Sequence, residues 1–199
     1  MQKFLKIFSL ALLVCFLAAC KPATEAGKLV AQDITGADFG QTFHLTDHTG
    51  KPRTMEDFKG KAIALFFGYT HCPDVCPTTM ADLKQTMKLL GTRADEVQVL
   101  FVTLDPKRDT QEVLAQFVPS FDARFIGLRG SEEEIAATAA VFKIYAKKVE
   151  AQGQSGYTID HSAGMYIFDK NGKIRLYVDY GQKPADIAND IKQILWVRV

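Results

Sequence analysis

Hydrophobic residues occur along this chain in two patterns, short continuous runs and helically spaced stripes. The segments AIALFFGYT at 62–70 and VQVLFVTLD at 97–105 are apolar throughout and too short for typical helices. Such runs predict strands that are buried on both faces. From Pro77 onward the pattern changes, because Met80, Leu83, Met87 and Leu90 recur on one helical face before Gly91. We therefore predict a long helix directly after the first buried strand.

The remaining elements follow from turn and cap signals. A hairpin is expected to turn at 50–52, and a helix near 110–118 should follow Asp109 and Thr110. Ser131 to Glu134 has a capping-box pattern that opens another helix. Residues 145–160 are expected to form a hairpin or mobile loop, 163–180 a hairpin turning at 171–172, and 184–196 an amphipathic helix. This order predicts an α/β, thioredoxin-like fold: a central mixed sheet flanked by helices, with an N-terminal β-hairpin and an inserted hairpin or loop.

The first residues have the composition of an export signal. Lys3 and Lys6 precede an apolar run from 7 to 19, which is shorter than the roughly 20 residues of a membrane span. Small residues before Cys20 resemble a lipoprotein cleavage box. We predict a signal peptide at 1–19, acylation of Cys20 with a linker at 20–40, and a folded domain at 41–199. An ordinary secretory signal or an uncleaved anchor remain alternatives, and every one of these readings exports the domain to the cell envelope.

Composition narrows the classes of function. The chain has 199 residues and a formal charge of +1; loss of residues 1–19 removes two lysines, leaving 180 residues and a charge of −1. That length suits one domain, and the lack of a basic block argues against a nucleic-acid partner. Of four cysteines, Cys15 leaves with the signal and Cys20 is the predicted lipid attachment site. Cys72 and Cys76 are left as a redox pair or a metal site.

The spacing of Cys72 and Cys76 favours metal binding. Three residues separate them, where redox thioredoxins have two, although the pair can still close to a disulfide. Cys76 is expected in the first turn of the helix that follows the strand, where unpaired amides lower thiol pKa values and favour thiolate. Two thiolates select copper(I), zinc or an iron–sulfur cluster. A structural disulfide is the alternative for this pair.

A third ligand has to come from elsewhere in the chain. Of the four histidines, His44 and His48 lie in the polar hairpin, His71 abuts Cys72, and His161 leads into a predicted core strand. Thioredoxin-like folds usually carry a cis-proline beside the cysteines at that last position. This chain has no proline between Pro119 and Pro184. We therefore favour His161 as the third ligand.

Three separated motifs carry a family resemblance. The segments FGYTHCPDVCPTTM, FVTLDPKRDT and YTIDHSAGMYIFDKNG, with the terminal DYGQ, resemble the Sco/SenC family over about residues 40–195. That family consists of chaperones that deliver copper to the CuA centre of cytochrome c oxidase. The resemblance implies a Cu(I) or Cu(II) site formed by Cys72, Cys76 and His161. It also implies that Asp105 lies near the site and tunes metal capture, with Asp160 and, more weakly, Asp74 as outer partners.

The resemblance further implies partners. They are the oxidase subunit that carries CuA, other periplasmic copper chaperones or thioredoxin-like proteins, and the membrane through the N-terminal lipid. The segment 145–160 and Tyr69 are expected at the docking surface. The leading hypothesis is thus a metallochaperone, which is not an enzyme in the turnover sense. An exported thiol–disulfide oxidoreductase is the main alternative, since its chemistry uses the same two thiolates. A third hypothesis, a peroxidase-like antioxidant, is supported only by the predicted fold, and fold alone is poor evidence of function.

Overall fold

The computed structural model describes residues 28–150 and 156–196. The predicted signal peptide at 1–19 and the predicted acylation site Cys20 lie outside the described residues. Within the described part, no helix combines the length and apolar character needed to cross a membrane.

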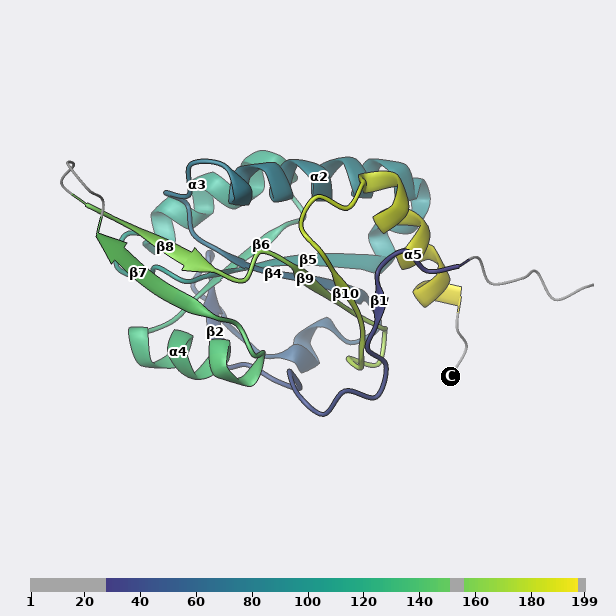
Figure 1. Cartoon of the computed structure of the whole chain (residues 1–199), viewed down its shortest axis with the longest axis horizontal. Coiled ribbons are helices and arrows are strands. Elements are labelled where there is room, and N and C mark those ends of the chain that lie inside the picture. Colours follow the sequence, from purple (N-terminus) through teal and green to yellow (C-terminus); the bar gives the residue numbers. More distant parts are fainter. Residues whose placement is uncertain (1–27, 151–155, 197–199) are drawn as a thin grey trace, which may run out of the picture.

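A mixed sheet of eight strands forms the centre of the fold (Figure 1). Its order is β1-β10-β9-β4-β5-β6-β2-β3. β4, β5 and β6 are parallel, whereas the other neighbouring strands pair antiparallel. The bounds are β1 Gln32–Asp33, β2 Leu45–Asp47, β3 Pro52–Arg53, β4 Ala62–Gly68, β5 Val97–Thr103, β6 Ile126–Arg129, β9 Met165–Phe168 and β10 Ile174–Val178.

Helices cover both faces of this sheet, which explains why β4 and β5 are buried at every position. α2 (Val75–Leu90), α3 (Gln111–Phe121) and α5 (Pro184–Trp196) lie on one face, and α4 (Glu132–Val141) lies on the other (Figure 1). Two short 3₁₀ helices, η1 (Met55–Phe58) and η2 (Gly91–Glu96), complete the connections. The predicted thioredoxin-like α/β fold is confirmed.

The segment 145–160, predicted as a hairpin or loop, contributes most of a separate two-stranded sheet. β7 (Ala146–Glu150) pairs antiparallel with β8 (Tyr157–His161), and Ala146 lies opposite His161. Every residue of β7 is exposed, so this β7–β8 hairpin projects from the body of the domain, as Figure 1 shows. His161 ends β8 and is followed by the chain entering β9 in the core.

Four local predictions differ from the structure. α2 begins at Val75, two residues before Pro77, and α3 continues through Pro119 to Phe121. The short strand β6 was not predicted. The predicted linker at 20–40 is wrong for its described second half, because β1 pairs with β10 and Ala31 is buried in the core. The apolar residues in β6 and in the predicted linker are too few to show the periodicity of a strand in the sequence.

Candidate metal centre

The two cysteines lie where β4 passes into α2. β4 ends at Gly68, Cys72 lies in the connection, and Cys76 is the second residue of α2. The backbone amide of Cys76 donates to Cys72 Sγ at 3.4 Å. This amide belongs to the first helical turn, where backbone donors lack intrahelical partners. A Cβ on Gly68 would lie 2.8 Å from Cys76 Sγ, so the absence of a side chain there makes room for the buried sulfur.

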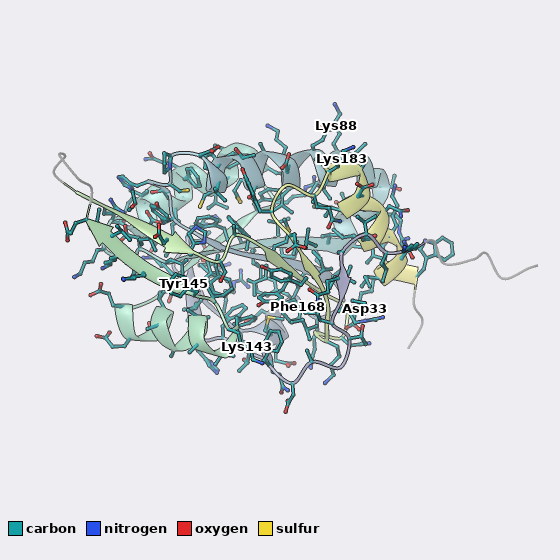
Figure 2. All side chains as sticks on the ribbon, in the orientation of Figure 1. Asp33, Lys88, Lys143, Tyr145, Phe168 and Lys183 are labelled. Carbon is teal, nitrogen blue, oxygen red and sulfur yellow. The ribbon has the colours of Figure 1, made fainter. Side chains whose placement is uncertain are left out.

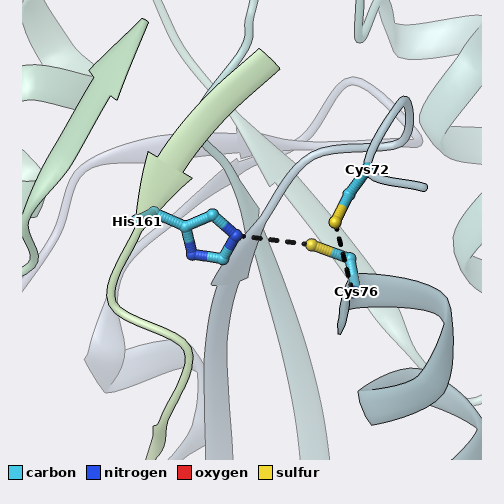
Figure 3. Close-up of side chains that lie close together, drawn as sticks. All are labelled: Cys72, Cys76 and His161. Atoms are coloured by element: carbon cyan, nitrogen blue, oxygen red, sulfur yellow. Dashed lines mark hydrogen bonds between the residues drawn. The ribbon is translucent and has the colours of Figure 1, made fainter. Parts of the chain in front are cut away.

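His161 reaches the sulfur pair from the end of the β7–β8 hairpin. Its Nε2 lies 3.5 Å from Cys76 Sγ (Figure 3). One ligand atom from each of Cys72, Cys76 and His161 can be chosen so that all three lie within 4.8 Å of one another. Phe66 and Tyr69 contact the imidazole edge-on, with ring centroids 6.3 and 6.0 Å away. Side chains 85 residues apart in the sequence thus form one small cluster of donors.

The hydrogen bonding of His161 fixes which ring nitrogen can bind a metal. Nδ1 lies 2.8 Å from the carbonyl oxygen of Ser162. Because a carbonyl only accepts, Nδ1 carries the hydrogen and donates it. Nε2 then presents its lone pair toward the sulfur pair. A backbone carbonyl that orients a ligand histidine in this way is a common supporting interaction in metal sites.

Burial sets the protonation states of Cys76 and His161. It raises the pKa of the Cys76 thiol strongly above 9.0, and the neighbouring Cys72 and Asp109 add to that rise. It lowers the pKa of His161 below 6.5, which the bond to Ser162 and the charge of Asp160 partly oppose. The expectation that the helix end favours a Cys76 thiolate is therefore wrong for the metal-free protein. The imidazole is neutral near pH 7, while Cys76 is a thiol that must lose a proton to bind a metal.

The donor set fits copper. Two sulfurs and one imidazole are soft or borderline ligands, and this combination accepts either common oxidation state of copper. Cys72 is partly exposed and Cys76 is buried, and both are free thiols. An incoming ion therefore meets Cys72 first. A low-coordinate site with one accessible ligand suits an ion that is taken up and passed on.

Asp109 is a site-supporting residue that sequence reasoning missed. Its buried carboxylate accepts hydrogen bonds from the Thr70 amide at 3.0 Å, the Thr70 hydroxyl at 2.6 Å and the Thr103 hydroxyl at 2.6 Å. It thereby ties the start of the cysteine loop to the end of β5. The sequence signal was available, because polar residues that follow neighbouring parallel strands meet at one edge of a sheet.

Asp105 contributes through the β7–β8 hairpin. Its buried carboxylate accepts from Arg108 and, at 2.7 Å, from the Tyr157 hydroxyl. Arg108 also donates to the Tyr157 carbonyl at 2.9 Å and lies 3.8 Å from that ring's centroid. Asp105 is not among the residues that form the donor group. The Asp105–Arg108–Tyr157 contact instead fastens the start of β8, the strand that ends in His161.

The other predicted residues lie around the centre without joining it. Asp160 is exposed, and strand alternation turns it to the opposite face of β8 from His161. Asp74 caps the start of α2 and accepts from the Thr78 hydroxyl at 3.4 Å. Tyr69 is 2% exposed, so its expected place on a docking surface is wrong. The remaining histidines also lie outside the donor group: His44 is exposed, His48 Nδ1 accepts from the Gly127 amide, and His71 is exposed beside Thr70.

Fold and site together define a thioredoxin-like domain with a two-sulfur, one-imidazole group suited to a soft metal ion. The family model described as SCO1/SenC matches residues 31–196, and the chain belongs to this family. The resemblance inferred from the three sequence motifs is thereby confirmed. The match also begins within the predicted linker, in agreement with the packing of Ala31.

Individual relatives agree with this assignment. The mitochondrial SCO2 homolog of Danio rerio is 39% identical over 140 residues, covering 69% of this chain and 49% of that protein. Copper-bound ScoI of Bradyrhizobium japonicum superposes with a TM-score of 0.72 at 39% identity, covering 79% of this chain and 99% of that one. A SCO1/SenC family lipoprotein of Bacillus anthracis gives a TM-score of 0.68 at 26% identity, covering 84% and 99%. The chain spans about half the length of the vertebrate curated relatives it matches.

Proposed function

We propose that this chain is a copper metallochaperone of the cell envelope, which binds one copper ion through Cys72, Cys76 and His161 Nε2. The observation that carries the proposal is the convergence of two free sulfurs and a correctly oriented imidazole within 4.8 Å. The copper-bound relative from Bradyrhizobium supports the choice of metal. The recipient proposed here is the CuA site of cytochrome c oxidase, on the strength of the family resemblance.

The arrangement suits transfer of copper by ligand exchange. Cys72 is the more exposed ligand, so it can share the ion with an incoming thiolate before Cys76 and His161 dissociate from it. Closure of a Cys72–Cys76 disulfide would remove both sulfur ligands and switch binding off. Asp105 is proposed to act indirectly, by holding Tyr157 and the strand that carries His161. Asp160 is proposed to act only through its charge.

An envelope location is part of the proposal. The basic start and apolar run at 7–19 followed by Cys20 predict a lipoprotein that faces away from the cytoplasm. A relative from Bacillus anthracis is itself described as a lipoprotein. Globomycin, an inhibitor of lipoprotein signal cleavage, should make the unprocessed chain accumulate. Mass spectrometry of the membrane fraction should locate diacylglycerol on Cys20.

Anaerobic titration of the purified chain against a Cu(I) chelator tests the binding site. One copper per chain is expected, with tight binding lost in Cys72→Ser and Cys76→Ser and strongly weakened in His161→Ala. His71→Ala is the matched control, because this imidazole is next to Cys72 in sequence yet outside the donor group. Wild-type affinity in Cys76→Ser, or equal losses in the two histidine variants, would overturn the assignment.

A second function, thiol–disulfide exchange, is favoured by one observation: both cysteines are free thiols and their sulfur atoms lie within 4.8 Å of each other. In that reaction one thiolate of the pair attacks a target disulfide and the other releases the target as a dithiol. The His161→Ala variant distinguishes the two functions, because it should weaken copper binding strongly and leave reductase activity intact. A chain without copper affinity that reduces target disulfides would make exchange the main function.

A further inference from the structure

The end of the domain opposite the metal centre presents an apolar and basic surface. We define the anchor face by six residues that the start of the described chain, the end of α2 and α5 contribute: Lys28, Val30, Lys88, Leu89, Lys192 and Trp196. Val30, Leu89 and Trp196 are 58%, 41% and 76% exposed. They are three of the seven large apolar side chains classed as exposed in the described part of the chain.

Hydrogen bonds and one cation–π contact join the elements that carry most of these residues. The Val30 and Ala31 amides donate to the carboxylate of Asp190 on α5, the latter at 2.8 Å. Lys192 Nζ donates to the Leu89 carbonyl at 3.1 Å, which joins α5 to the end of α2. The Arg93 guanidinium lies 5.5 Å from the centre of the Trp196 ring. Lys88 precedes Leu89 near the end of α2, and Figure 2 shows it projecting from the same side of the molecule as Lys183.

The charge of the anchor face is positive. Lys28 and Lys88 are exposed, and Lys192 adds a third ammonium group. Two carboxylates beside the face are engaged within the protein. Asp190 is fully buried against the Val30 and Ala31 amides, and Glu96 pairs with Arg93 and Lys170.

The covalent chain brings this face close to a membrane. Ala31 is fixed to α5, so the chain joins the domain at the anchor face. Lys28 follows Cys20 by eight positions. Eight steps of fully extended chain span at most about 28 Å. An uncleaved apolar segment ending at residue 19 adds one position to this limit, so either anchor holds the face near the bilayer.

We infer that the anchor face docks on the surface of an anionic phospholipid bilayer. Tryptophan prefers the interface between headgroups and acyl chains, and lysines bury their stems while their ammonium groups contact lipid phosphates. Exposed Val30 and Leu89 add apolar area beside them. The inference goes beyond the proposed copper transfer and does not require copper to be bound.

Docking by this face orients the metal centre. Cys76 and Leu89 lie 13 residues apart on α2, and a rise of about 1.5 Å per residue separates them by about 20 Å along the helix. With the end of α2 on the bilayer, the centre faces away from the lipid. An upright domain presents Cys72 to partners that project from the same membrane.

Trp196 is the only tryptophan of the chain, so its fluorescence reports directly on the anchor face. The full chain would be reconstituted in vesicles of phosphatidylethanolamine and phosphatidylglycerol with brominated acyl chains. We expect a blue shift, bromine quenching, and protection from acrylamide. In Lys88→Gln/Lys192→Gln the docking equilibrium should fall about 25-fold, at about fivefold for each basic residue near an anionic surface.

The matched control is Lys107→Gln/Lys147→Gln, which removes the same charge outside the anchor face and should leave quenching unchanged. Replacing phosphatidylglycerol by phosphatidylcholine should weaken quenching as the anchor-face variant does. Absence of bromine quenching in the wild-type chain would overturn the inference. So would equal effects of the two double variants, or protection of Trp196 that appears only when a protein partner is added. Copper titration of the same variants should be unchanged, which separates this result from a failure of the metal site.

Discussion

Copper binding is expected to release a proton from Cys76, and this makes affinity depend on pH with a sign that the structure fixes. Burial raises the pKa of the Cys76 thiol well above 9.0. At pH 7, fewer than about 1% of the molecules then carry this ligand as a thiolate. Bound copper requires the thiolate, so the proton must leave on binding. Affinity therefore rises with pH and falls as pH falls.

The magnitude follows from proton stoichiometry. Each proton released changes the apparent binding constant about tenfold per pH unit, or about 1.4 kcal/mol. Cys76 supplies one such proton between pH 7 and 8. His161 adds none in that window, because burial lowers its pKa below 6.5 and the ring is already neutral. Below its lowered pKa the imidazole becomes charged, so the pH dependence should steepen in acid.

The dependence of copper affinity on pH can be measured by anaerobic competition with a Cu(I) chelator of known proton stoichiometry, repeated from pH 6 to 8. Proton release into weakly buffered solution measures it independently. His161→Ala should bind copper more weakly with the same slope between pH 7 and 8, because the proton comes from sulfur. A wild-type affinity that is constant over this range, with no proton released, would show that Cys76 is already ionised and refute the reasoning.

Three further predictions concern the residues that hold the ligands. Gly68→Ala should keep the fold and weaken copper binding, because its Cβ would meet Cys76 Sγ at 2.8 Å; overpacking of this kind costs about 1–3 kcal/mol in urea unfolding. Asp109→Ala should destabilise the domain by about 3 kcal/mol, since one buried and two partly buried donors lose their acceptor, and Asp109→Asn should cost less. Tyr157→Phe should destabilise the domain by about 1 kcal/mol, because it removes the hydrogen bond to Asp105. Hydrogen–deuterium exchange of the β8 amides, measured by mass spectrometry, should become faster.

Matched variants isolate these effects. Gly127→Ala in β6 places a Cβ 3.0 Å from Val118 on α3, so it should destabilise the domain without changing copper affinity. Tyr145→Phe removes a hydroxyl from a side chain that is 58% exposed and should leave exchange in β8 unchanged. Equal copper affinities for Gly68→Ala and the wild type would contradict the first prediction. Unaltered exchange in Tyr157→Phe would show that its hydroxyl does not fasten the hairpin.

The main elements were predictable where apolar periodicity was strong. β4, β5 and α2 could be identified because their buried residues form continuous apolar runs or a single apolar stripe along a helix. His161 could be expected at the centre because it occupies the position of a missing proline. β6 was missed because four residues, IGLR, give almost no pattern. The raised pKa of Cys76 depends on burial, which the chemistry of a single residue does not reveal. The role of Asp109 was missed although its place after β5 offered a signal, because its contact with Thr70 joins residues 39 positions apart.

The apolar packing around the sulfur pair has a consequence for repeated copper binding. Cys76 belongs to a hydrophobic core that includes β4 and α2, and Cys72 packs against that core. Small zinc domains, by contrast, unfold when their ion leaves. Under the proposed copper transfer, this domain would stay folded after releasing an ion and would accept the next one without a refolding step.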